Sequence, residues 1–138
     1  MDRIINVSDK SNVAMHALAL AASSGGRVTA SQCASRLGVS PSYLAKVLQI
    51  LVHGGLFAST RGAAGGFDLA RDAASISCLE VIELMEGPLP ARACLFRETV
   101  CVTAGCAIKT MCERVENTLL STLRSTSMAA LAASFKEE

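Results

Sequence analysis

Apolar residues recur every three or four positions along most of the chain, which predicts a mainly α-helical fold. One such segment covers residues 12–22 and ends at Gly25-Gly26. Another opens at Ser77, in a sequence typical of a capping box, and is ended by Gly87-Pro88. A last, longer segment has one apolar face, which predicts a helix that packs against a partner. That face consists of Ile108, Met111, Val115, Leu119 and Leu123.

The segment between residues 29 and 55 has the pattern of a helix-turn-helix. The sequence Thr29–Gln32 is typical of a capping box and opens a short helix that runs to Leu37. Gly38 permits a tight turn, and Ser40-Pro41 then supplies an N-cap and a proline at the first helical position. Two packed helices without a DNA-binding role give the same pattern, so the residues that follow decide the interpretation.

Two strand-like runs, residues 56–60 and 67–70, flank a glycine-rich loop and predict a β-hairpin. Arg61 lies at the base of this hairpin, and its guanidinium could enter a minor groove or pair with a phosphate. A nucleotide-binding loop is the alternative, but no Lys-Ser/Thr pair follows the glycines and no helix begins there. The pattern therefore favours a small wing beside the helix-turn-helix.

Composition supports a compact DNA-binding domain rather than a binder of single strands. The chain has 138 residues, of which 51% are hydrophobic and only 4% aromatic, so a core can form but base-stacking platforms are scarce. The net charge of +1 hides an asymmetry, because residues 1–72 carry seven basic against four acidic side chains and residues 73–138 carry six against eight. No acidic residue occurs between Lys10 and Phe67, which lets this half approach phosphates without repulsion.

The six cysteines call for a separate explanation. No signal segment opens the sequence, and the apolar stretch at residues 13–22 is too short to span a membrane, so we expect a cytoplasmic protein. In that compartment clustered thiols serve metal or redox chemistry more often than disulfides. Four of them follow the pattern Cys94-x6-Cys101-x4-Cys106-x5-Cys112, which favours an iron–sulfur cluster over structural zinc and leaves thiol redox chemistry open.

Nearly the whole chain resembles the IscR/NsrR-type winged-helix regulators of bacteria, the Rrf-two family. The most specific match is the Arg-Gly-x-x-Gly-Gly-aromatic sequence after the helix-turn-helix, and the resemblance extends to residues 127–131. The matching residues include Ser40-Pro41-Ser42-Tyr43-Leu44, Gly55-Leu56, Ser59-Thr60-Arg61-Gly62, Gly65-Gly66-Phe67, Leu69-Ala70 and the run from Ile76 to Ile82.

The resemblance implies a homodimer that binds a palindromic double-stranded operator. It places the DNA contacts of the recognition helix and wing at Ser40, Ser42, Tyr43, Lys46, Arg61 and Gly62. At Ala45, however, some members of the family carry a glutamate that reads cytosine, so their base preference does not transfer.

The resemblance also implies an iron–sulfur cluster, either 2Fe-2S or 4Fe-4S, bound by Cys94, Cys101 and Cys106. Lys109 and Asn12 stand where the family has its fourth ligand, and neither side chain matches. Cys112 is a possible fourth ligand, but if one helix contains both Cys106 and Cys112 the two thiols lie about 120° apart around it. Cys33 and Cys78 fall at apolar helix positions and are expected to be small core residues.

These observations predict a mainly α protein with a small β-hairpin: a winged helix-turn-helix domain plus a long C-terminal dimerisation helix. We expect a DNA-binding domain at residues 1–86, a cysteine-bearing sensor loop at 87–105, and the dimerisation helix with a short C-terminal helix at 106–138. The expected function is regulation of transcription by a cluster that senses iron, redox state or nitric oxide. A cluster-free regulator that senses through thiols and a small metal-binding electron carrier are the alternatives. No pattern typical of a catalytic site occurs, so an enzyme is not expected.

Overall fold

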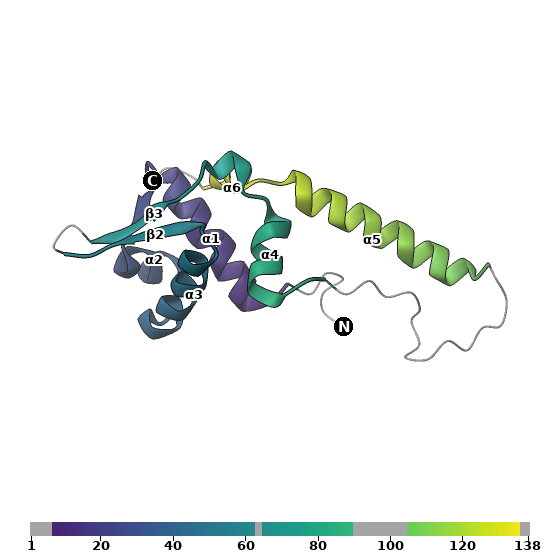
Figure 1. Cartoon of the computed structure of the whole chain (residues 1–138), viewed down its shortest axis with the longest axis horizontal. Helices are drawn as coiled ribbons and strands as arrows, with labels where there is room; N and C mark the ends of the chain where they lie inside the picture. The colour runs from purple at the N-terminus through teal and green to yellow at the C-terminus, as the bar shows by residue number, and fades with distance from the viewer. Residues whose placement is uncertain (1–6, 63–64, 90–104, 136–138) are drawn as a thin grey trace.

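The computed structural model describes residues 7–62, 65–89 and 105–135, and shows a small helical body from which one long helix extends (Figure 1). The long helix is α5, and a three-stranded sheet forms one edge of the body. The helices are α1 (Asp9–Ser23), α2 (Ala30–Leu37), α3 (Pro41–His53), the 3₁₀ turn η1 (Ala73–Ser75), α4 (Cys78–Glu86), α5 (Ala107–Ser125) and α6 (Met128–Ala132). The strands are β1 (Arg27–Val28), β2 (Phe57–Thr60) and β3 (Gly66–Leu69).

Helix α1 lies at the centre of the body and packs against α2, α3, α4 and α6. Ser8 caps it by accepting a hydrogen bond from the Ser11 backbone N–H at 3.1 Å. Five of its fifteen residues are alanines, and Ala14, Ala17 and Ala21 are fully buried. Small side chains let neighbouring helices pack closely on several sides of α1. This helix therefore exposes a narrower polar face to solvent than an ordinary surface helix does.

The helix-turn-helix forms as its caps predict. In α2 the Thr29 hydroxyl accepts from the Gln32 backbone N–H while the Gln32 side chain accepts from the Thr29 backbone N–H, which completes the capping box. Gly38 ends α2 at φ 64°, a left-handed conformation that favours glycine. Helix α3 then begins with Pro41 at its first position and buries Leu44, Val47, Leu48 and Leu51.

The sheet has three strands rather than the two of the predicted hairpin. Its order is β1-β3-β2 and all pairs are antiparallel, with Arg27 opposite Asp68 and Ser59 opposite Phe67. Phe57 and Phe67 pack edge to face with ring centroids 6.0 Å apart. The added strand, β1, has two residues, too few for an alternating pattern to show in the sequence.

The chain returns to the body after α5. The Cys78 backbone N–H donates to the Thr126 carbonyl at 2.8 Å, and the Met128 backbone N–H donates to the Ile76 carbonyl at 2.8 Å. Met128 is fully buried, and α6 packs on α1. These contacts hold the C-terminal end of α5, while its N-terminal end lies far from the body (Figure 1).

None of the helices in the described part of the chain combines the length and apolarity needed to cross a lipid bilayer.

Candidate nucleic-acid interface and cysteine segment

Helix α3 presents one polar, solvent-exposed face opposite the leucines that it buries. Ser42 and Lys46 lie on this face and are exposed, one turn apart. Ala45, Gln49 and His53 are exposed as well and extend the same face towards the C-terminal end of the helix. The DNA contacts of α3 that were predicted from the sequence end at Lys46. Gln49 lies seven residues after Ser42, and this helical spacing could have identified it as part of the same face.

Ser40 and Tyr43 are also predicted to contact DNA, and both have a structural role at the start of α3. The Ser40 hydroxyl accepts a hydrogen bond from the Tyr43 backbone N–H at 3.2 Å, which caps the helix. Its oxygen lies 3.5 Å from the Ser42 hydroxyl. Tyr43 is half-buried and packs against the hydrophobic core. The helix N-terminus is therefore a rigid, hydroxyl-rich end with Ser40 and Ser42 at the surface.

The hairpin between β2 and β3 begins its turn at the two predicted wing residues. Arg61 and Gly62 are exposed, and Gly62 has φ 106°, which only glycine adopts readily. The backbone N–H of Gly65 donates to the Gly62 carbonyl at 2.9 Å, and a Cβ on Gly65 would stand 2.8 Å from that oxygen. Glycine at both positions therefore lets the loop close tightly beside Arg61.

The acidic side chain of the hairpin, Asp68, is paired with a basic one. Arg27 on β1 donates to both carboxylate oxygens of Asp68 on β3, at 2.9 and 3.1 Å. Thr60 on β2 adds a hydrogen bond to the same carboxylate at 3.2 Å. The pairing crosses all three strands and offsets the negative charge nearest to the wing.

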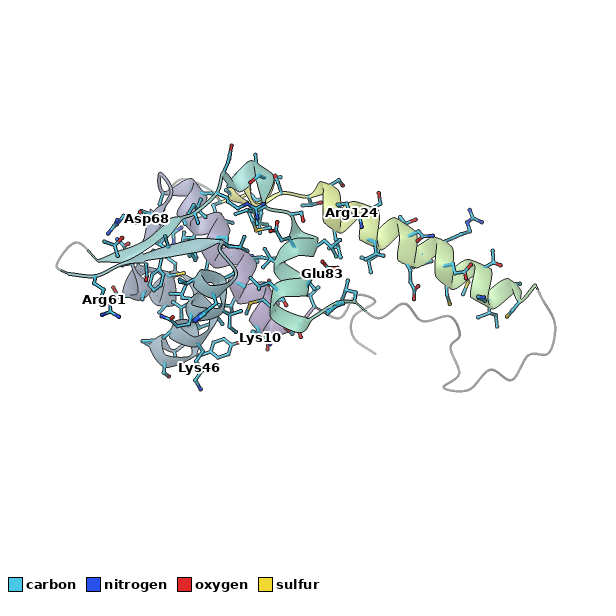
Figure 2. The ribbon with its side chains drawn as sticks, in the orientation of Figure 1. Lys10, Lys46, Arg61, Asp68, Glu83 and Arg124 are labelled. Atoms are coloured by element: carbon cyan, nitrogen blue, oxygen red, sulfur yellow. The ribbon has the colours of Figure 1, made fainter. Side chains whose placement is uncertain are left out.

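The exposed basic side chains of α3 and the wing share one side of the body. Figure 2 shows Lys46 and Arg61 projecting from the lower left of the molecule, whereas Arg124 lies in the last turn of α5, on the other side of the body. Helix α3 and the hairpin thus form a surface with exposed hydroxyls, a lysine and an arginine. Such a surface can approach a phosphate backbone and the edges of bases.

Cys33 and Cys78 are core residues, as their positions in the sequence predict. Their side chains are 0% and 8% exposed. Burial raises the pKa of the Cys33 thiol to about 11 and also raises the pKa of Cys78. Both thiols are therefore held protonated in apolar surroundings, which suits packing rather than metal binding.

Of the four predicted cluster ligands, Cys94 and Cys101 lie outside the described residues. Cys106 is the N-cap of α5 and half-buried, and Cys112 is half-buried within the helix. Since α5 begins after Cys106, the helical separation that argued against pairing Cys106 with Cys112 does not apply. Residues 7–62, 65–89 and 105–135 alone contain no group of three potential metal-binding side chains.

Comparison with known proteins identifies the family. The model of the Rrf2 family, described as iron-dependent transcriptional regulators, matches residues 7–134. An HTH-type transcriptional regulator of Lactococcus lactis is 38% identical over 105 residues, which cover 72% of this chain and 67% of that protein. The regulator IscR of Escherichia coli is 38% identical over 72 residues, 52% of this chain and 44% of that protein. The chain thus spans less than half of the IscR sequence that it matches.

Solved structures show the same fold. CymR, the global cysteine regulator of Bacillus subtilis, superposes with a TM-score of 0.83 at 24% identity and covers 96% of this chain and 100% of its own. IscR of T. potens superposes with a TM-score of 0.71 at 25% identity and covers 98% of this chain and 95% of its own. Both have the winged helix and long C-terminal helix described above. The chain therefore belongs to the Rrf2 family of winged-helix transcriptional regulators and is not an enzyme.

Proposed function

We propose that this protein is a homodimeric regulator whose affinity for a palindromic double-stranded operator is set by an iron–sulfur cluster. The observation that carries the DNA-binding part is the surface formed by α3 and the wing, with Lys46 and Arg61 on one side of the body. The match over residues 7–134 to a family described as iron-dependent supports the iron part. The predicted division into residues 1–86, 87–105 and 106–138 follows these roles.

In the proposed complex α3 lies in the major groove and the hairpin lies against the neighbouring backbone. Ser40, Ser42, Tyr43 and Lys46 contact DNA from the start of α3, and the packing of Tyr43 against the core also holds this end of the helix in place. Arg61 pairs with a phosphate or enters the minor groove, and Gly62 allows the backbone to approach closely. Phosphate contacts position the protein, and contacts to base edges give specificity.

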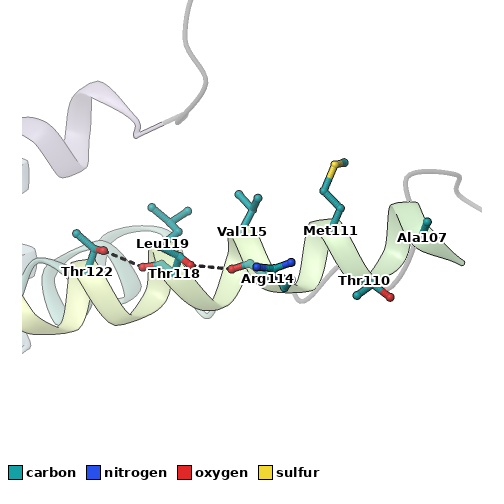
Figure 3. Close-up of a pocket in the computed structure, with 8 residues that line it drawn as sticks. All are labelled: Ala107, Thr110, Met111, Arg114, Val115, Thr118, Leu119 and Thr122. Carbon is teal, nitrogen blue, oxygen red and sulfur yellow. Dashed lines mark hydrogen bonds between the residues drawn. The ribbon is translucent and has the colours of Figure 1, made fainter. Parts of the chain in front are cut away.

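The proposed dimer forms through α5. No residue of α5 is buried in the single chain, and its apolar side chains Ile108, Met111 and Val115 are 52%, 55% and 60% exposed. Figure 3 shows Met111, Val115 and Leu119 on one side of α5, where they form an apolar surface. A face of this kind is costly in water, and a second copy of α5 is the complementary surface that the chain itself offers.

The proposed ligands of the cluster are Cys94, Cys101 and Cys106, with Cys112 as a possible fourth. A set of three thiolates suits iron, because cysteine is the usual ligand of iron–sulfur clusters. Cys106 stands at the N-terminus of α5, where the partial positive charge of the helix favours an anionic ligand atom. When bound, such a cluster supplies a centre that is gained, lost or oxidised with iron supply and redox state.

Helix α4 connects the cysteine segment to the DNA-binding domain. Its last residue, Glu86, accepts hydrogen bonds from the hydroxyls of Ser8 and Ser11, the latter at 2.8 Å. These bonds tie the end of α4 to the start of α1, the central helix of the body. A rearrangement of the cysteines would therefore be transmitted through α4 to α3 and the wing. The regulator would then have two conformations.

A cluster-free regulator that senses through its thiols is the second candidate. The specific observation that favours it is the likeness to CymR structures, one of which is an oxidised form from Staphylococcus aureus with a TM-score of 0.74. In this case Cys94 and Cys101 form a disulfide in place of binding iron. The same DNA-binding surface and the same dimer helix serve both candidates.

Anaerobic purification tests the two candidates directly. The cluster proposal expects coloured protein that contains iron and sulfide, with the visible absorbance lost in Cys101→Ala and Cys106→Ala. Cys112→Ala is the informative companion, because retained absorbance excludes it as a required ligand. Colourless protein without iron or sulfide contradicts the cluster and favours the thiol sensor. A DNase footprint with and without the cluster then shows which form binds the operator, and the absence of any footprint in both forms contradicts sequence-specific binding.

A further inference from the structure

The exposed face of α3 has a defined geometry around the helix axis. At 100° per residue, the five exposed side chains beyond its first residue fall within about 100° of arc, and Gln49 lies near the middle of that arc. They are Ser42, Ala45, Lys46, Gln49 and His53. Leu44, Val47, Leu48 and Leu51 anchor the opposite face in the core. The backbone positions from which these side chains project are therefore fixed relative to the core.

The spacing of this face suits major-groove recognition. Ser42, Ala45, Lys46 and Gln49 stand at positions i, i+3, i+4 and i+7, the same set that homeodomain recognition helices use to contact bases. Gln49 lies about 10 Å along the axis from Ser42, which corresponds to roughly three base-pair steps. The face is thus long enough for Ser42 and Gln49 to reach different base pairs of one half-site.

The Gln49 side chain is available for recognition. Within the described residues its side-chain amide makes no hydrogen bond, and the contact of His53 Nδ1 with Gln49, at 2.7 Å, is to the backbone carbonyl. One turn earlier on the same face stands Ala45, whose single methyl group leaves space in front of Gln49. A larger residue at position 45 would hold the helix further from the floor of the groove, so the alanine lets a glutamine amide reach it.

We propose that Gln49 reads an adenine in each half-site of the operator, an inference that rests on the DNA-binding function proposed above. Adenine presents the N6 amino group as donor and N7 as acceptor in the major groove, and a glutamine amide matches both with its oxygen and its N–H. Guanine offers two acceptors at the same edge and cannot complete this pair. Gln49 is therefore a specificity-determining residue for double-stranded DNA, distinct from the contacts assigned at the start of α3.

Selection from random double-stranded DNA tests this assignment, with the full chain purified anaerobically. The wild-type protein is expected to select an operator with one adenine per half-site that is lost or degenerate in the sequences selected by Gln49→Ala. Replacing that adenine by guanine should weaken wild-type binding roughly 5- to 150-fold and leave Gln49→Ala almost unaffected. Gln49→Glu should change the preference to cytosine, whose N4 amino group donates to a carboxylate.

Two further comparisons make the outcomes unambiguous. Gln49 is exposed and alanine is the better helix former, so Gln49→Ala is expected to keep its helical circular dichroism and melting temperature. Lys46→Ala is the matched variant on the same face, and because it removes a positive charge it should weaken binding and lower the salt dependence while the adenine assigned to Gln49 is still selected. If Gln49→Ala selects the same operator as the wild type, Gln49 is not a base-reading residue although the protein still binds DNA. If the wild type selects no operator, the DNA-binding function itself is overturned.

Discussion

Gly54, the C-terminal cap of α3, lies directly against Leu84 of α4. A Cβ atom added at Gly54 would stand 2.3 Å from Cδ2 of Leu84, far inside van der Waals contact. Gly54 has φ −78° and ψ 0°, an ordinary helical conformation, so the requirement for glycine is one of space and not of backbone strain. The end of the recognition helix is thus in contact with the helix that leads to the cysteine segment, and movement of one presses on the other.

The first prediction concerns this contact. Gly54→Ala should lower the free energy of unfolding by about 1 kcal/mol, because the added methyl overpacks the contact while the Leu84 side chain can partly yield. In a Leu84→Ala background the same substitution should stabilise by about 0.4–1 kcal/mol, since alanine restricts the unfolded chain more than glycine does. Urea denaturation of the four proteins of this cycle measures the reversal of sign. Equal effects in both backgrounds would mean that the two residues do not interact.

The second prediction concerns the wing. Arg61→Ala should weaken binding to all DNA sequences and reduce the slope of log K against log salt by about 1, because one phosphate contact is lost. Arg124→Ala removes the same charge from the last turn of α5, away from α3 and the wing, and should leave the slope unchanged (Figure 2). Fluorescence titration with labelled DNA at several salt concentrations measures both. Matching slopes for the two variants would remove the wing from the interface.

The third prediction concerns the dimer. Val115→Glu places a charge in the apolar face of α5 and should give a monomer of 14.4 kDa, whereas the wild type should have twice that mass. Asn117 is exposed and lies about 160° away around the helix, so Asn117→Glu adds the same charge on the other side and should remain dimeric. Sedimentation equilibrium distinguishes the two masses. A monomeric wild type would leave the apolar face of α5 without its proposed partner.

Features set by neighbours in sequence could be predicted, and features set by distant contacts could not. The caps at Thr29 and Ser40 and the end of α2 at Gly38 depend on residues within four positions, so the helix-turn-helix could be read directly. The short strand β1 exists only because Arg27 and Val28 pair with β3, some forty residues later. The apolar face of α5 repeats every three or four residues, so both the helix and its packing against a partner could be predicted, and the single chain indeed buries no residue of α5.

The fourth prediction concerns pH and the junction of α1 with α4. Hydrogen bonds from Ser8 and then Ser11 lower the pKa of the Glu86 carboxyl, with a smaller contribution from Lys10. Because the pKa is lower in the folded state, this stabilisation is complete above about pH 4.3, the ordinary value, and is lost as the pH falls through the folded-state pKa. The wild type should therefore lose stability on acidification more steeply than Glu86→Gln.

Denaturation between pH 7 and pH 3 provides the measurement for Glu86. The difference in unfolding midpoint between wild type and Glu86→Gln should stay constant above pH 5 and shrink below pH 4. Glu83→Gln is a suitable control, because Glu83 is an exposed residue of the same helix. A difference that does not change with pH would show that the bonds from Ser8 and Ser11 do not favour the charged carboxylate.

The fifth prediction concerns the reactivity of the buried thiol of Cys33. Burial raises the pKa of Cys33 to about 11, so its thiolate fraction at pH 8 is roughly 200-fold below that of an ordinary thiol with a pKa near 8.5. Cys33 should therefore escape iodoacetamide at pH 8 in native, cluster-free protein and react fully in urea, as peptide mass spectrometry would show. Its native labelling rate should continue to rise with pH beyond 9, where an exposed thiol levels off. Rapid native labelling of Cys33 would place this thiol outside the closed core that α1, α2 and α3 form around it.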